Sequence, residues 1–140
     1  MKLIRRVTGL SLGLVAALSL TLVGATPAAA ATWTLEHTPG HPQRVCVAPE
    51  RGWPNTYFLA PVSGTWDTVI TTGLSDLPPG SYSNGGAINP GEGRDGSYIG
   101  LVHVSIAPAP AGDYTATLWA DDGTETQTVP VMISFQEECY

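Results

Sequence analysis

The sequence predicts an all-β protein: a single antiparallel β-sandwich of about seven strands after an N-terminal signal peptide. Three observations lead to this prediction. Short runs rich in Val, Ile, Thr and aromatic residues alternate with turn residues along the chain. No stretch keeps a helical period, and the chain holds 16 glycines and 12 prolines. Its two cysteines lie far apart, as in an exported domain stapled by one disulfide.

The first 31 residues have the layout of a secretory signal peptide. Lys2, Arg5 and Arg6 give a positive start, an apolar stretch covers residues 7–23, and the alanine run over 28–31 offers small residues for cleavage after Ala30 or Ala31. The apolar stretch is near the lower limit for a membrane span, so an uncleaved anchor is the alternative. We expect cleavage, and a secreted, extracellular domain over residues 32–140.

The predicted domain is strongly acidic. Residues 32–140 hold three arginines and no lysine against twelve Asp and Glu, which gives a net charge of −9 with histidine neutral. Such a chain repels nucleic acids and anionic lipid surfaces. We therefore expect no nucleic-acid partner, no membrane partner after cleavage, and a free monomer.

Cys46 and Cys139 are the only cysteines. An even number in an exported protein is typical of a disulfide, and with two the pairing is forced. In the chain-entropy model a bond that closes so long a loop stabilises the fold by about 4.5 kcal/mol. The alternative is a thiol pair for metal or redox chemistry, but the chain has no Cys-x-x-Cys motif.

The expected strands cover residues 32–37, 44–48, 56–60, 65–72, 98–106, 113–120 and 125–135. Residues 73–97 are rich in Gly, Pro and Asn, and we expect a long surface loop there with at most one short strand near Tyr82. Pro130 cannot donate a ladder hydrogen bond, so its strand is predicted to be an edge or bulged at that point.

The last two strands are predicted to form a hairpin with Asp122 and Gly123 as its loop. This turn would place Trp119 opposite Thr126 and Thr117 opposite Thr128. Strict alternation then predicts one core face, made of Tyr114, Ala116, Leu118, Val129, Val131, Ile133 and Phe135, with Val102, Val104 and Ile106 from the preceding strand.

The run Ala-Pro-Ala-Gly-Asp-Tyr-Thr-Ala over residues 109–116, followed by this hairpin, resembles the E–F corner and last two strands of immunoglobulin-like domains. The resemblance implies an immunoglobulin-like β-sandwich in which the Tyr114 hydroxyl bonds back to the corner. Cys139 lies beyond the last strand, so the disulfide would be an end staple. More loosely, the chain resembles small exported actinobacterial proteins of unknown function, which implies no activity.

Candidate catalytic and metal-binding residues are sparse. The chain has no Gly-x-Ser-x-Gly motif, and we expect no enzyme, no cofactor and no metal site. His103, or His37 with His41, leaves a small exported hydrolase or metal-dependent enzyme as an alternative. A structural cell-surface component is another. Asn89, Glu92 and Asp95 supply oxygen atoms in a Gly-rich run but do not match an EF-hand.

Four tryptophans give the best functional hint. Trp66 is the predicted core tryptophan. Trp119 is predicted to point outward beside Thr117 and Thr126, unless a loop covers it, and Trp53 lies in a predicted turn before Pro54. Exposed tryptophans stack on sugars or anchor protein contacts. We therefore expect a non-catalytic binding module for an exported protein or polysaccharide, a class that includes inhibitors, with these residues and the 73–97 segment as its contacts.

Overall fold

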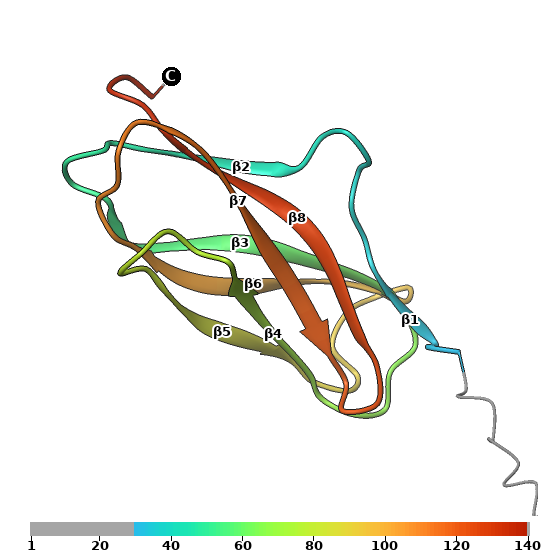
Figure 1. The fold of residues 1–140 in the computed structure, drawn as a ribbon. Helices are drawn as coiled ribbons and strands as arrows, with labels where there is room; N and C mark the ends of the chain where they lie inside the picture. Colours follow the sequence, from blue (N-terminus) through green and yellow to red (C-terminus); the bar gives the residue numbers. More distant parts are fainter. Residues whose placement is uncertain (1–29, 140) are drawn as a thin grey trace, which may run out of the picture.

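The computed structural model describes residues 30–139, so the signal peptide predicted over residues 1–31 lies almost wholly outside the described residues. No helix long and apolar enough to cross a membrane occurs in this part of the chain. Its regular structure consists of strands (Figure 1): β1 (Trp33–Leu35), β2 (Gln43–Val47), β3 (Trp53–Gly64), β4 (Ile70–Ser75), β5 (Tyr82–Ile88), β6 (Ser97–Ile106), β7 (Gly112–Asp121) and β8 (Thr126–Phe135).

The eight strands form one sheet in the order β1-β3-β6-β5-β4-β7-β8-β2. The sheet curls so that its β1–β3–β6–β5 half packs behind its β4–β7–β8–β2 half, which gives the predicted sandwich (Figure 1). The prediction of an entirely antiparallel sheet is wrong, because β2 pairs in parallel with β8. The chain leaves β1 at one edge of the sheet and crosses to the opposite edge before β2 begins. There β2 runs in the same direction as β8.

The core lies between the two halves and is built by alternation. Alternate residues through the middle of β6, β7 and β8 point inward and are buried, as the pattern predicted, and β3 alternates in the same way from Thr56 to Val62. The core tryptophan is Trp33, which is 2% exposed, and not Trp66, which is half-buried on the β3–β4 connection. The largest fully buried side chains come from both halves: Val47, Phe58, Val62, Ile70, Ile88, Val102, Val104, Ile106, Leu118, Val131, Ile133 and Phe135.

The β7–β8 hairpin is confirmed, but its predicted register is wrong by two residues. Trp119 lies opposite Thr128, and Asp121 lies opposite Thr126. The loop is longer than predicted because the Asp122 carboxylate accepts the backbone N–H groups of Thr124 and Glu125, both at 2.8 Å. A shift of two keeps every side chain on its predicted face.

Pro130 lies where the sequence predicted an open edge. It pairs with Thr117 of β7 on one side, and the pairing of β8 with β2 begins one residue later, at Val131. The missing N–H of Pro130 therefore interrupts no ladder with β2.

The segment 73–97 is not one long loop, because the short strand allowed for near Tyr82 is present as β5 and covers seven residues. β5 runs through it and joins the two halves of the sheet, pairing with β6 on one side and β4 on the other. A Cβ atom on Gly85 would lie 2.7 Å from the Thr72 carbonyl oxygen, and one on Gly86 would lie 2.3 Å from the Leu101 carbonyl oxygen. Glycine is required here because three backbones approach closely where the sheet bends.

The two features predicted around the C-terminal strands are confirmed. The Tyr114 hydroxyl donates to the Pro110 carbonyl at 3.2 Å, and the Tyr114 ring packs edge-on against Phe135 with ring centroids 5.3 Å apart. Cys46 on β2 is bonded to Cys139 beyond the end of β8, with Cα atoms 5.6 Å apart. The staple therefore fixes the C-terminus to the edge strand β2.

Replacing Tyr114 by Phe tests the corner bond. The ring contact with Phe135 survives this change, and only the hydroxyl bond to Pro110 is lost. We expect the free energy of unfolding to fall by about 1 kcal/mol, measured by urea denaturation. An unchanged midpoint and slope would show that the corner bond contributes nothing to stability.

Candidate functional site

Two glutamine side chains hold the open ends of the curled sheet together. Leu35 N–H of β1 donates to Gln127 Oε1 of β8 at 2.8 Å, and Gln127 Nε2 donates to the Trp33 carbonyl at 2.9 Å. Gln43 of β2 bonds Leu59 of β3 in the same way, with its Oε1 accepting at 2.8 Å and its Nε2 donating at 2.6 Å. Each side-chain amide thus pairs with a strand edge as a backbone peptide would. We call this line of contact the seam.

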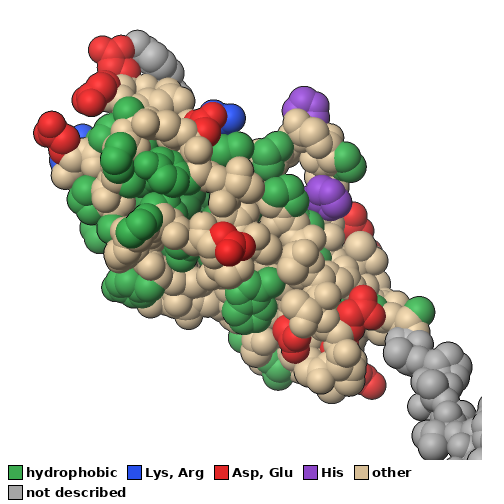
Figure 2. Space-filling view, viewed as in Figure 1, with side chains coloured by type: hydrophobic (Ala, Val, Ile, Leu, Met, Phe, Trp, Pro, Cys, Tyr) green, Lys and Arg blue, Asp and Glu red, His purple; other side chains and the backbone are tan. Residues whose placement is uncertain are grey.

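A pocket of about 200 Å³ lies at the seam, under the connection from β1 to β2. The connection is held at one end by the Glu36 N–H, which donates to the Pro61 carbonyl at 2.8 Å, and is folded by a turn in which His41 N–H donates to the Thr38 carbonyl at 3.0 Å. Figure 2 shows histidine side chains on this connection. The pocket walls are mainly apolar: Pro42, Leu59, Pro61, Ile99, Val129 and Pro130.

The pocket brings together two of the three histidines that the sequence singled out. His37 and His41 both line it, beside Glu36, whereas His103 is not among its lining residues. No group of three or more His, Cys, Asp or Glu side chains able to hold a metal ion occurs among residues 30–139.

The outer surface of β3, β6 and β5 carries an unusual set of exposed apolar side chains, which we call the apolar face. None of these three strands contains Asp, Glu, Lys or Arg. The register places Leu59 beside Leu101 and Pro61 beside Ile99. Its large members are Tyr57 (51% exposed), Leu59 (38%), Ile99 (57%), Leu101 (45%) and Tyr82 (57%).

The charges of the domain lie off this face. Ten of the twelve Asp and Glu lie outside the strands, and the other two, Asp113 and Asp121, lie near the ends of β7. Figure 2 shows acidic side chains at both ends of the molecule, with one further group near the middle of the visible surface. His103, on β6, is the one histidine of the apolar face, and its ring lies edge-on to Tyr57 with centroids 6.4 Å apart. His103 is exposed, and no local pattern in the sequence identifies the apolar face as a whole.

The opposite outer surface, on β7 and β8, holds the predicted Trp119 site. Trp119 points outward but is half-buried, because its indole lies across Gly73 of β4, where a Cβ atom would lie 2.3 Å from the ring. The Thr117 hydroxyl donates to Asp76 at 2.7 Å, and the Thr126 hydroxyl donates to Asp121. The hydroxyl groups of the predicted site are therefore already hydrogen-bonded within the protein.

Trp53, the other predicted contact, is 44% exposed at the start of β3. It begins a strand rather than lying in a turn, and the pairing with β6 is irregular between Trp53 and Thr56. Its side chain lines an open depression together with the Cys46–Cys139 disulfide. This places Trp53 at the stapled end of the molecule, beside the first residues of the apolar face.

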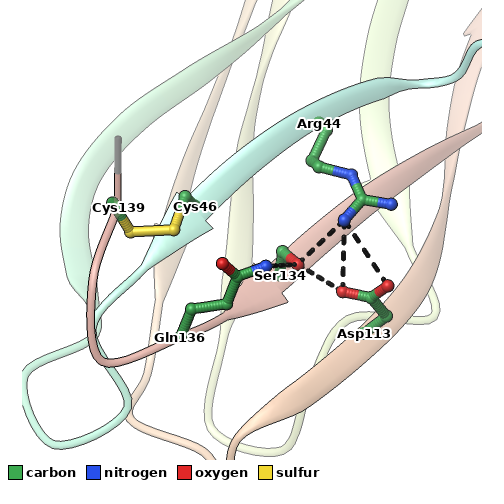
Figure 3. Close-up of polar contacts among 6 residues, drawn as sticks. All are labelled: Arg44, Cys46, Asp113, Ser134, Gln136 and Cys139. Atoms are coloured by element: carbon green, nitrogen blue, oxygen red, sulfur yellow. Dashed lines mark hydrogen bonds and ion pairs between the residues drawn. A yellow bond between two sulfur atoms is a disulfide. The ribbon is translucent and has the colours of Figure 1, made fainter.

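A polar cluster next to the disulfide was not predicted (Figure 3). Ser134 is fully buried, and its hydroxyl donates to Asp113 while accepting from Arg44 Nη1 at 3.1 Å and from Gln136 Nε2 at 2.9 Å. A hydroxyl has one hydrogen to donate and two lone pairs, so all its bonds are made. The cluster clamps β2, β7 and β8 together and leaves Ser134 no free lone pair for chemistry. No local pattern predicts this cluster, because its members are scattered along the chain.

At the end of the molecule opposite the disulfide, the carboxylate of Asp122 binds the indole of the core residue Trp33. The Trp33 Nε1–H donates to Asp122 Oδ2 at 2.7 Å, and Oδ1 accepts from the backbone and hydroxyl of Thr124 and from the Glu125 N–H. These bonds, the Trp33 bond first, hold the pKa of Asp122 well below its ordinary value. The charged carboxylate is thus the form that the fold binds.

The change Asp122→Asn tests this role through pH. Since the pKa of Asp122 is lower in the folded chain than in the unfolded one, its charge stabilises the fold above about pH 4, and the effect is lost as the pH falls through the folded pKa. We expect Asp122→Asn to lower stability at pH 7 and the difference from the unaltered protein to shrink as the pH falls below 4. Thermal melting between pH 2 and 7 measures this. A difference that is constant with pH would contradict it.

The fold and surface described here define a small disulfide-stapled β-sandwich with an uncharged apolar face. The chain belongs to a family of unknown function, DUF5980, which matches residues 34–137. Comparison with curated protein sequences gives no match. Among solved structures, the chain is similar to the ASH / PapD-like domain of human CEP192 (PapD-like domain 7), with 14% identity over 88% of this chain and 96% of that one and a TM-score of 0.36.

Proposed function

We propose that this protein is an exported, non-catalytic binding module whose contact surface is the apolar face. One observation carries the proposal: five of the seven large apolar side chains that are exposed lie on one face whose strands have no charged residue, in an otherwise acidic domain. Soluble proteins rarely expose large contiguous apolar patches, and charged residues are depleted at the centre of protein interfaces.

Export is supported by the leader-like first 31 residues and by the disulfide. Disulfides persist in oxidising compartments, and Cys46–Cys139 joins segments 93 residues apart, so the bond restricts the unfolded chain strongly. The partner is then another exported protein or a polysaccharide.

The surface around Trp119 ranks below the apolar face as a contact site. Its indole is packed on Gly73, and its threonine hydroxyls bond to Asp76 and Asp121, so a ligand would have to displace existing bonds. A ligand that binds the apolar side chains of the apolar face has no such hydrogen bonds to displace. Trp53 lies at the end of β3, where it can extend the contact.

A capture experiment tests the proposal. The oxidised domain is immobilised and exposed to the producing organism's culture supernatant and to insoluble cell-wall polysaccharides. We expect a saturable partner whose retention falls at least tenfold in Leu101→Asp, because a carboxylate at the centre of the apolar face must be desolvated on binding. Bound material is identified by mass spectrometry.

Thr128→Asp is the matched control, since it adds the same charge to an exposed strand position on β8, on the opposite outer surface. Both variants are first shown to melt as the unaltered domain does. Equal retention by Leu101→Asp and the unaltered domain, or equal loss in both variants, would contradict a contact through the apolar face.

A further inference from the structure

We infer that the seam pocket receives one aromatic or branched apolar side chain from a basic protein partner. The inference rests on the proposed function and deepens it, because it names the class of partner and the point at which that partner is anchored.

The size and walls of the pocket fit one side chain. A dry cavity of about 150 Å³ accepts benzene, so a pocket of about 200 Å³ has room for one aromatic ring or a branched aliphatic group. Proline supplies no N–H and has a fixed ring, so the proline walls are apolar and stiff. Three of the walls are prolines: Pro42, Pro61 and Pro130.

The pocket is formed before any ligand arrives. The Gln43 amide, which lines it, is held at both ends by Leu59, and the Glu36 backbone is bonded to Pro61. The Glu36 carboxylate is itself positioned by a hydrogen bond from the Ser63 hydroxyl. Binding therefore costs little ordering of the protein, which is the condition for a preorganised site.

The pocket opens onto the apolar face. Leu59, Pro61 and Ile99 belong to both, since they lie on the outer surface of β3 and β6 and also line the pocket. A partner lying on the face thus reaches the pocket without rearrangement of the domain. A buried apolar anchor flanked by a flatter contact is the usual arrangement of an energetic hot spot.

Charge selects a basic protein among the candidate occupants. Glu36 is the one Asp, Glu, Lys or Arg among the pocket's lining residues, which also include His37 and His41. The domain carries twelve carboxylates against three arginines, so a cationic partner is attracted and steered toward it. A second copy of this chain carries the same excess of negative charge and is repelled. A neutral sugar would find its hydroxyl groups facing mainly apolar walls, at the cost of desolvating them.

Three indole probes that differ in charge test the inference on the intact oxidised domain. These are tryptamine (cationic), N-acetyltryptophanamide (neutral) and N-acetyltryptophan (anionic), followed by methyl NMR titration, with cellobiose as the sugar arm. We expect tryptamine to shift the methyl resonances of Leu59, Ile99 and Val129, and to bind about twofold to fivefold more tightly than the neutral probe, the effect of one exposed ion pair. The anionic probe should bind most weakly.

Two variants locate the effect. Glu36→Gln keeps an oxygen to accept from Ser63 but removes the charge, so the preference for tryptamine over the neutral probe should disappear. Ile99→Ala should weaken all three indoles, whereas Leu101→Ala, on the same strand and face but outside the pocket lining, should bind them as the unaltered domain does.

Three outcomes would overturn the inference. The first is saturable binding of cellobiose with no indole shifts at the pocket. The second is a set of indole shifts that Ile99→Ala leaves unchanged, and the third is dimerisation through these methyl groups without any probe. These failures are distinct from failure of the proposed function. If Leu101→Asp abolishes partner capture while no probe enters the pocket, the apolar face stands as the contact surface and the pocket inference is wrong.

Discussion

When a sheet curls on itself, the backbone N–H and C=O groups of its two edge strands still need hydrogen-bond partners. The rest of this structure depends on how those partners are supplied. β1 covers only residues 62–64 of β3, and β2 covers only residues 131–135 of β8, so each long strand extends past its neighbour. Gln127 and Gln43 take the place of the missing strand partners, each with one donor and one acceptor. The Cys46–Cys139 disulfide and the Ser134 cluster hold the β2–β8 edge at the opposite end of these strands.

This closure explains where a ligand can bind. Because the crossing from β1 to β2 bridges the seam instead of continuing a ladder, it leaves a pocket beneath it, bounded by the edges of β3 and β8. The carboxylates lie in the turns and at the strand ends, where water solvates them, and this leaves the apolar face on β3, β6 and β5 without charge. In the proposed function, the acidic residues off the face attract a basic partner and the uncharged face supplies the area on which it rests.

Much of the fold could be predicted from local pattern. Alternation over β6, β7 and β8 identified the inward residues, and the Gly-x-Tyr motif identified the corner made by Tyr114. A strand near Tyr82 was allowed for, but neither its length nor its pairing could be predicted, because the glycines of β5, needed for close backbone approach, erase the alternation. Trp33 was not chosen as the core tryptophan because its N–H partner, Asp122, lies 89 residues away. The two glutamine bridges follow no local pattern either, because Gln127 bonds Leu35 across 92 residues and Gln43 bonds Leu59 across 16. The pocket beside them is therefore hidden as well.

Backbone hydrogen exchange tests most directly whether the two glutamines close the sheet. The account predicts that the N–H groups of Leu35 and Leu59, both on otherwise open edges, exchange slowly in the unaltered domain. Gln127→Ala should accelerate exchange at Leu35 and leave Leu59 slow, and Gln43→Ala should do the reverse. Fast exchange at both positions in the unaltered domain, or rates that neither variant changes, would contradict the account.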